Sequence, residues 1–302
     1  MRSSFFVSIV LAVVSVVAPA AAKLSVVTTT QDPAAITRSI GGDRVTVTAL
    51  AKGYQDPHFL DAKPSYMLLL HNADLVEVIG LDLEIGYIGP IVAGARNDKI
   101  QPGQPGFLDL SQFIQPLEVV AVADRSQGDI HPNGNPHYWL DPENGRAMAR
   151  GIAARLAALD PGGQALYAAN LAAFEQTLTA KEAEWQARMA PLAGKPIITF
   201  HRSWTYFTAR YHLEVAGFVE PKPGIPPAPM HTLGLIKLVR ARGIKILLVE
   251  SFYDRSAPAI IAEKSGARLV AVASSVGGDA GVDTYFDLFD RITAELERAL
   301  RS

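Results

Sequence analysis

Short runs of apolar and β-branched residues alternate with segments of helical periodicity along most of the chain. Such alternation is typical of parallel sheets that are covered by helices on both faces. The pattern therefore predicts the α/β class, with two similar lobes built on mainly parallel sheets. The runs predicted to form strands are Leu24–Thr30, Val45–Leu50, Leu75–Gly80, Leu117–Ala123, Pro196–Phe200, Leu213–Val219, Lys245–Ser251 and Arg268–Ala273.

One segment between the two halves has a purely helical character. From Gln164 to Met189 the apolar residues recur at helical spacing, without glycine or proline. At 1.5 Å per residue, such a helix is about 35–40 Å long and can run beside both lobes. We therefore predict an N-terminal lobe over residues 23–160, a linking helix over 161–194 and a C-terminal lobe over 195–302.

The N-terminus has the pattern of an export signal. Arg2 precedes an apolar run from Phe5 to Val17, and small residues follow it up to Ala22. A charged start, a short apolar core and a small-residue end are typical of a secretory signal peptide. The run is shorter than the roughly 20 apolar residues that span a bilayer. We expect residues 1–22 to be a signal peptide, and the mature protein to be periplasmic and not inserted in a membrane.

Composition narrows the chemistry that the chain can perform. The sequence has no cysteine, so it can form no disulfide, and any metal ligands must be nitrogen or oxygen atoms. Its formal net charge is −2, without the basic face that nucleic-acid binding requires. These properties favour a protein that is stabilised by a large core and acts on a small ligand, and a monomer is expected.

Four residues stand at comparable places, each just downstream of a predicted strand. They are His58, His137, His201 and Asp283. Because ligands bind beyond the carboxyl ends of parallel strands, each lobe would supply two of them to a site in the cleft between the lobes. Three imidazoles and one carboxylate suit a divalent ion such as zinc. The pattern predicts a metal site with these four ligands and Zn²⁺ as the bound ion.

Each of these residues also has a purely structural interpretation. A single histidine at a strand end more often packs in a core or holds a turn, and only the set of three favours a metal. Asp283 precedes a predicted amphipathic helix and could be its N-cap. Asp279 and Glu250 are therefore alternative fourth ligands. His131 could contact the metal transiently, but its polar, glycine-rich surroundings predict a solvated side chain.

Several motifs resemble one known family over nearly the whole mature chain. They include Asp-Pro-His at 56–58, Asn-Pro-His-Tyr-Trp-Leu-Asp-Pro at 135–142, Phe-His at 200–201 and Asp-Thr-Tyr at 283–285. The chain resembles the metal-binding solute-binding proteins of zinc and manganese ABC transporters, in the cluster with a rigid helical linker. The resemblance implies two lobes bridged by a long helix, a metal between them, and delivery of that metal to an inner-membrane permease.

The resemblance also bears on which metal is carried. In this family a histidine at the position of His201 goes with zinc, and a glutamate goes with manganese. The chain departs from many zinc members in one respect. Their long histidine- and acid-rich loop corresponds here to Ser126–Pro136, which has only His131. A periplasmic metallochaperone as a second partner, which that loop would serve, therefore stays an open alternative.

Two other functions compete with zinc capture for an importer. A manganese-binding member of the same family is the first. An exported zinc hydrolase is the second, with Glu250 or Asp279 as its general base. The chain lacks an HExxH helix, which disfavours the hydrolase. We therefore expect a transport protein and not an enzyme.

Overall fold

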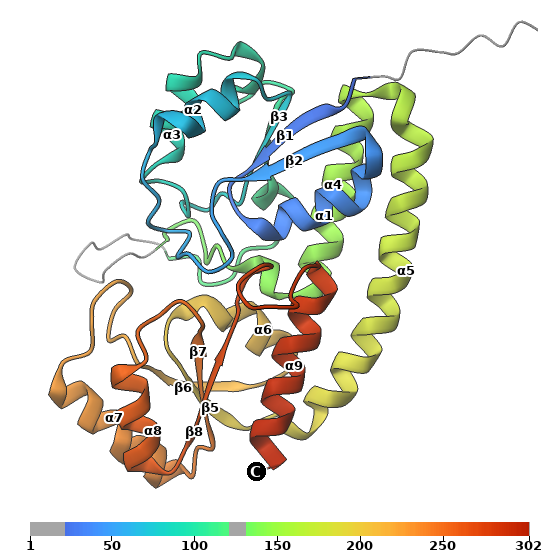
Figure 1. The fold of residues 1–302 in the computed structure, drawn as a ribbon. Helices are drawn as coiled ribbons and strands as arrows, with labels where there is room; N and C mark the ends of the chain where they lie inside the picture. The colour runs from blue at the N-terminus through green and yellow to red at the C-terminus, as the bar shows by residue number, and fades with distance from the viewer. Residues whose placement is uncertain (1–21, 121–130, 302) are drawn as a thin grey trace, which may run out of the picture.

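The computed structural model describes residues 22–120 and 131–301, in which two lobes each contain a four-stranded parallel sheet (Figure 1). The strand orders are β2-β1-β3-β4 and β6-β5-β7-β8, so the two sheets have the same topology. The strands are β1 Leu24–Thr28, β2 Val45–Ala49, β3 Leu75–Val78, β4 Phe107–Asp109, β5 Pro196–Thr199, β6 Glu214–Phe218, β7 Ile246–Glu250 and β8 Arg268–Val272.

Both sheets are buried on both faces, which explains their almost continuous apolar sequences. Neighbouring residues of one strand, Val26 and Val27, belong to two different apolar clusters. In the second lobe Leu247 and Leu248 divide in the same way. The covering helices are α1 Gln31–Gly41, α2 Pro64–His71, α3 Ile88–Ala95 and α4 Pro142–Leu159 in the first lobe, and α6 Thr205–Arg210, α7 Pro229–Arg242, α8 Ser256–Ser265 and α9 Tyr285–Arg301 in the second.

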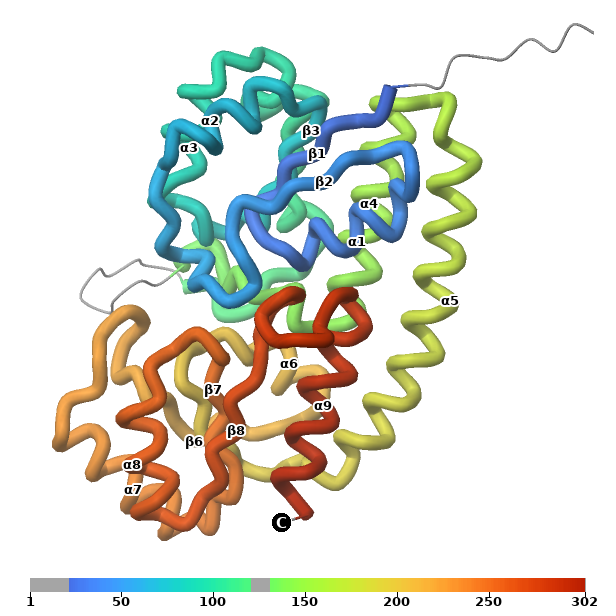
Figure 2. Tube along the Cα trace, viewed as in Figure 1, coloured from blue at the N-terminus to red at the C-terminus, as the bar shows by residue number. Residues whose placement is uncertain are grey.

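A single helix of 26 residues, α5 Gln164–Met189, runs beside both lobes, as the sequence predicts (Figure 2). Near its start the Asn170 side chain donates a hydrogen bond to the Ile40 carbonyl of the first lobe, at 2.9 Å. Near its end the Trp185 indole donates to the carboxylate of Asp290 in the second lobe, at 2.8 Å. The helix therefore holds both lobes through buried and half-buried contacts.

The loop after β8 joins the lobes a second time. Its Ser275 hydroxyl and Val276 amide donate to the two carboxylate oxygens of Asp32 in α1, at 2.6 and 3.0 Å. Gly53 of the first lobe lies so close to this loop that a β-carbon there would be 2.1 Å from the Val276 carbonyl oxygen. A glycine is therefore required at position 53 for the lobes to meet in this way.

One predicted strand is wrong. The fourth strand of the first sheet is Phe107–Asp109, whereas the apolar run predicted as a strand begins at Leu117. Leu117 lies outside any strand and its amide donates to the Tyr206 hydroxyl of the second lobe, at 2.9 Å. Val119 and Val120, which follow it, are exposed, so this apolar run is not a buried strand. Residues 121–123 of the predicted strand lie outside the described part.

The structure also bears on membrane association. Within the described residues, no helix combines the length and the apolar character needed to cross a bilayer. The predicted signal peptide falls almost entirely outside those residues.

Candidate metal centre

Three histidines from distant parts of the chain converge between the lobes. One ring nitrogen from each of His58, His137 and His201 lies within 4.8 Å of the others. The ring centroids are 5.1 to 5.4 Å apart. In a zinc tetrahedron with bonds of 2.0–2.1 Å, two ligand nitrogens are about 3.4 Å apart. Any two of the three nitrogens therefore need to approach by at most about 1.4 Å to share one ion.

His58 is fixed by the residue two positions before it. The Asp56 carboxylate accepts hydrogen bonds from the His58 amide, at 3.0 Å, and from its ring Nδ1, at 2.7 Å. Pro57 between them restricts the backbone of this turn. Burial alone would raise the pKa of Asp56, but the hydrogen bonds and the electrostatic attraction from His58 outweigh it and lower that pKa. Asp56 is therefore an ionised, firmly held acceptor.

His137 repeats the same local arrangement with an amide in place of the carboxylate. The Asn135 side-chain oxygen accepts from the His137 amide and from its Nδ1, both at 2.9 Å. The Asn135 nitrogen donates in turn to the Arg202 carbonyl of the second lobe, at 2.9 Å. Burial, and then the neighbouring histidines, lower the pKa of His137 well below its ordinary value, so its ring is neutral.

His201 is positioned by the sheet of the second lobe. It directly follows β5, and its carbonyl accepts a hydrogen bond from the Thr199 hydroxyl at 2.9 Å. Its Nδ1 lies 2.8 Å from the carboxylate of Glu220, a buried residue just after β6. Because β5 and β6 are neighbours, the register of the sheet brings histidine and carboxylate together.

Asp56, Asn135 and Glu220, which bond to the three Nδ1 atoms and are called the outer partners, determine which ring nitrogen is left for a metal. Each partner offers an oxygen that only accepts hydrogen bonds, so each Nδ1 must carry the proton. The Nε2 atoms are then left for a metal, and the Nε2 atom of His58 is buried without any hydrogen-bond partner among the described residues. The arrangement presents imidazole nitrogens to one point, which suits a borderline-soft transition metal.

The structure does not bring Asp283 into this group. Among the described residues, the group of possible ligands contains only the three histidines. Asp283 is exposed, and its amide donates to the Asp287 carboxylate at 3.3 Å, just before α9 begins. The neighbouring Val282 is fully buried, which anchors the segment while Asp283 faces solvent.

Among the described residues, the two alternative carboxylates do not join the group either. The Asp279 carboxylate accepts from the Ala273 amide at 2.9 Å, within its own loop. Glu250 is completely buried, and burial raises its pKa to about 8, which keeps it protonated at neutral pH. A protonated carboxyl is a poor metal ligand and a poor general base, so neither the alternative ligand nor the hydrolase hypothesis gains support here.

A fourth imidazole, which the sequence predicts to be solvated, lies against the site. The His131 ring centroid is 5.3 Å from that of His58 and 6.4 Å from that of His137. Burial and the neighbouring histidines lower the pKa of His131 to about 3. Hydrogen bonds with the backbone of Leu81 and Asp82 act in the opposite direction and do not offset this lowering. The ring is therefore neutral. The sequence signal that His131 lies near the site is its closeness to the predicted ligand His137, with one proline beside each histidine, at 132 and 136.

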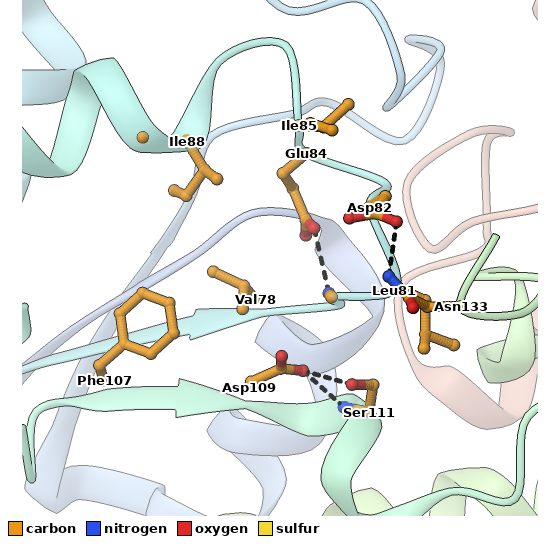
Figure 3. Close-up of a pocket in the computed structure, with 12 residues that line it drawn as sticks. Val78, Leu81, Asp82, Glu84, Ile85, Ile88, Phe107, Asp109, Ser111 and Asn133 are labelled. Carbon is orange, nitrogen blue, oxygen red and sulfur yellow. Dashed lines mark hydrogen bonds between the residues drawn. The ribbon is translucent and has the colours of Figure 1, made fainter. Parts of the chain in front are cut away.

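The segment that carries His131 borders a pocket of about 550 Å³ in the first lobe (Figure 3). The Asn133 side chain reaches the rim of this pocket and donates to the Asp82 carboxylate at 2.8 Å. The adjoining backbone has positive φ angles at Gly80, Leu81 and Asp82, of 77°, 51° and 65°. Glu84 holds this turn by accepting from the Gly80 amide at 3.0 Å.

Comparison with known proteins identifies the family of this chain. The sequence profile of the family described as zinc-uptake complex component A, periplasmic, matches residues 26–299. The manganese ABC transporter substrate-binding lipoprotein PsaA of Streptococcus pneumoniae is 28% identical over 273 residues, which cover 88% of this chain and 85% of PsaA. The iron ABC transporter substrate-binding lipoprotein MtsA of Streptococcus pyogenes serotype M1 is 27% identical over 249 residues, covering 81% and 77%.

The fold agrees with these sequence relationships. A crystal structure of ZnuA superposes with a TM-score of 0.77 and 26% identity, covering 92% of this chain and 99% of the ZnuA chain. Both proteins therefore have two parallel-sheet lobes with a long helix beside them. The chain belongs to the family of periplasmic zinc-uptake component A proteins.

Proposed function

We propose that this protein captures zinc in the periplasm and delivers it to the permease of an ABC importer. As a member of its family it is a substrate-binding protein of a metal ABC transporter and not an enzyme. Such proteins act together with a membrane permease. Relatives are named for manganese and for iron as well as for zinc, so the choice of metal has to be argued from the donor atoms of this chain.

The observation that carries the zinc proposal is the convergence of three imidazoles, without a carboxylate among them in the described part of the chain. The Nδ1 atoms are held by Asp56, Asn135 and Glu220, which leaves three Nε2 atoms as donors. Nitrogen-rich sites suit zinc, whereas manganese prefers carboxylate and other oxygen ligands. Asp283 remains a proposed fourth ligand only if its segment moves when the metal binds.

The proposed location rests on the N-terminal sequence. Residues 1–22 have the pattern of a cleaved signal peptide, and the family is described as periplasmic. Delivery by a periplasmic metallochaperone is a further part of the proposal for which the chain offers only the short loop around His131. N-terminal sequencing of the secreted protein tests the cleavage after Ala22.

The experiment that tests the metal is a competition titration of the mature protein with zinc and with manganese. We expect one tightly bound zinc per chain, and binding should be severely weakened in His137→Ala because a buried ligand is lost. His71→Ala is the matched control, since His71 is an exposed histidine of α2 whose ring bonds to the Ala95 carbonyl and which lies outside the group of three histidines. Tighter binding of manganese than of zinc would overturn the zinc proposal and leave the family assignment intact.

A further inference from the structure

We propose that Asn133 is a site of spontaneous deamidation, and that its conversion to an acidic residue loosens the segment beside the metal site. The consequence for the metal rests on the proposed function, whereas the reaction itself does not. Asparagine is thermolabile, and it reacts fastest before a glycine, because glycine has no β-carbon to shield its amide nitrogen. The sequence contains two Asn-Gly pairs, at 133–134 and at 144–145.

The reaction converts the side-chain amide of Asn133 into a carboxylate. The Gly134 nitrogen attacks the side-chain carbonyl carbon and loses its proton, and the side-chain nitrogen leaves as ammonia. The new carbon–nitrogen bond closes a five-membered succinimide ring. Water then adds to one of the two ring carbonyls and breaks its bond to nitrogen, which gives aspartate or isoaspartate. Water is the only co-reactant, and no atom is oxidised or reduced.

The pair at 133–134 lies in a turn that can open without disturbing a core. Asn133 is exposed and belongs to no helix or strand. The Gly134 amide donates to the His131 carbonyl at 3.1 Å, and this bond has to open before the nitrogen attacks. Turns at the surface open at a lower cost in free energy than packed elements do. Gly134 has a φ of 120°, and a β-carbon there would lie 2.5 Å from the Pro116 side chain, so this turn requires the glycine.

The pair at 144–145 has the same chemistry but is protected by the fold. The Gly145 amide donates to the Asp141 carbonyl at 3.1 Å, at the start of α4. A β-carbon at Gly145 would lie 2.3 Å from the Tyr285 ring, so α4 is packed directly against the second lobe here. The Asn144 side chain donates to the Tyr138 carbonyl at 3.1 Å. Attack at Asn144 therefore requires unwinding of a packed helix.

The product places a negative charge where the turn contacts the first lobe. The Asn133 side chain donates to the Asp82 carboxylate at 2.8 Å (Figure 3). A carboxylate at position 133 cannot donate this bond, and it would be repelled by Asp82. The backbone of Leu81 and Asp82 also hydrogen-bonds with the His131 ring. That ring lies 5.3 Å from the His58 ring between centroids. Deamidation therefore loosens a segment that is packed against the metal site, and the metal should leave faster.

The reaction is tested by incubating the mature protein at pH 8 and 37 °C and mapping its peptides by mass spectrometry. We expect the peptide with Asn133 to gain the mass difference between an amide and an acid, while the peptide with Asn144 stays unchanged. In urea both pairs should convert at similar rates. Asn133→Gln is the control, since the longer side chain cannot close a five-membered ring. Equal rates at the two pairs in the folded protein, or conversion at Asn133 only in urea, would overturn the proposal.

The consequence is measured by the zinc dissociation rate of Asn133→Asp in an excess of chelator. We expect the rate to rise by about two- to tenfold, the range for the loss of one hydrogen bond. Adding Asp82→Asn should return the rate toward that of the wild type, because donor and acceptor are then exchanged. The aged wild-type protein, in which the charge arises chemically, provides a second measurement.

An unchanged dissociation rate in both Asn133→Asp and the aged protein would overturn the link to the metal. Failure of Asp82→Asn to restore the rate would show that repulsion from Asp82 is not the cause. A mature protein that binds no zinc would contradict the proposed function instead, and the difference between the two Asn-Gly pairs would still be measured by mass.

Discussion

In the first lobe the ligand histidines His58 and His137 are carried by loops, whereas in the second lobe His201 directly follows a strand. The two loop histidines share one local arrangement, in which an Asp or Asn two residues earlier accepts from both the histidine amide and its Nδ1. His201 instead depends on Glu220, which is 19 residues away and reaches it across neighbouring strands.

The difference matters because the two sheets have the same strand order. Because the strand order is the same, the carboxyl ends of the strands are equivalent in the two lobes. The way in which the histidine side chain is oriented there nevertheless differs between the lobes. In the first lobe the hydrogen bonds that orient the ring are local in sequence, so they can survive movement of the loop. In the second lobe they require the intact sheet. We therefore expect the first-lobe ligands to move and the second-lobe ligand to stay fixed during metal exchange.

The largest effect is expected from changing the ligand of the second lobe. His201→Ala should abolish tight zinc binding, because the second lobe then supplies no imidazole to the site. His201→Glu should restore metal binding but shift the preference from zinc toward manganese, since an oxygen donor replaces a nitrogen donor. Parallel titrations with both metals measure the shift. An unchanged ratio of zinc to manganese affinity in His201→Glu would contradict it.

The next largest effect is a pH dependence of stability that comes from Asp32, which is hydrogen-bonded to the second lobe. Burial raises the pKa of Asp32 from 3.8 to about 7, although its hydrogen bonds from Ser275 and Val276 oppose this. Between pH 4 and 7 the folded protein therefore holds a proton that the unfolded chain has released. Stability must fall as the pH rises through this range, by up to about 4 kcal/mol for a shift of this size.

Asp32→Asn isolates this contribution from those of other buried carboxyls. An amide can accept from the Val276 amide and donate to the Ser275 hydroxyl without ever ionising. We expect the variant to resemble the wild type at pH 5 and to exceed its free energy of unfolding at pH 8. Urea unfolding of both proteins at the two pH values measures the difference, and parallel pH profiles would refute the role of Asp32.

The smallest effect tests whether the two loop arrangements are equivalent. Asp56→Asn turns the Asp-Pro-His turn into the Asn-Pro-His turn found at 135–137 and keeps the acceptor oxygen. We expect it to change zinc affinity by less than about tenfold, while Asp56→Ala, which removes the acceptor, should lose about 10–100-fold. Competition titration of the two variants side by side provides the comparison. Equal losses in both would mean that the charge of Asp56, and not its hydrogen bonds, matters.

Much of the architecture could be predicted from the sequence because it follows from burial patterns. The central strands β3 and β7 are buried along their whole length, and the continuous helical periodicity of Gln164–Met189 matches α5 residue for residue. The run beginning at Leu117 was predicted wrongly because an exposed apolar segment, with Val119 and Val120 open to solvent, has the same sequence pattern as a buried strand. Periodicity cannot distinguish these two environments.

The site was predictable only in part. His58, His137 and His201 are close in the structure because strand ends of parallel sheets face the same cleft. His131 was predicted to be solvated because its neighbours in the sequence are polar and rich in glycine, whereas in the structure its ring lies against that of His58, which is distant in sequence. Asp283 was predicted as a ligand because it follows the last predicted strand, but in the structure Val282 and Tyr285 on either side are buried and Asp283 is exposed.

Helix α5 has a consequence for the rate at which metal is exchanged. It is bonded to Ile40 in one lobe and to Asp290 in the other, so a wide rotation of the lobes would have to break one of these contacts. Opening by local unfolding of a loop requires less free energy than opening of a packed core. We expect the metal dissociation rate to follow the opening frequency of residues 51–63, which amide hydrogen exchange reports. The permease would then act by lowering that local barrier.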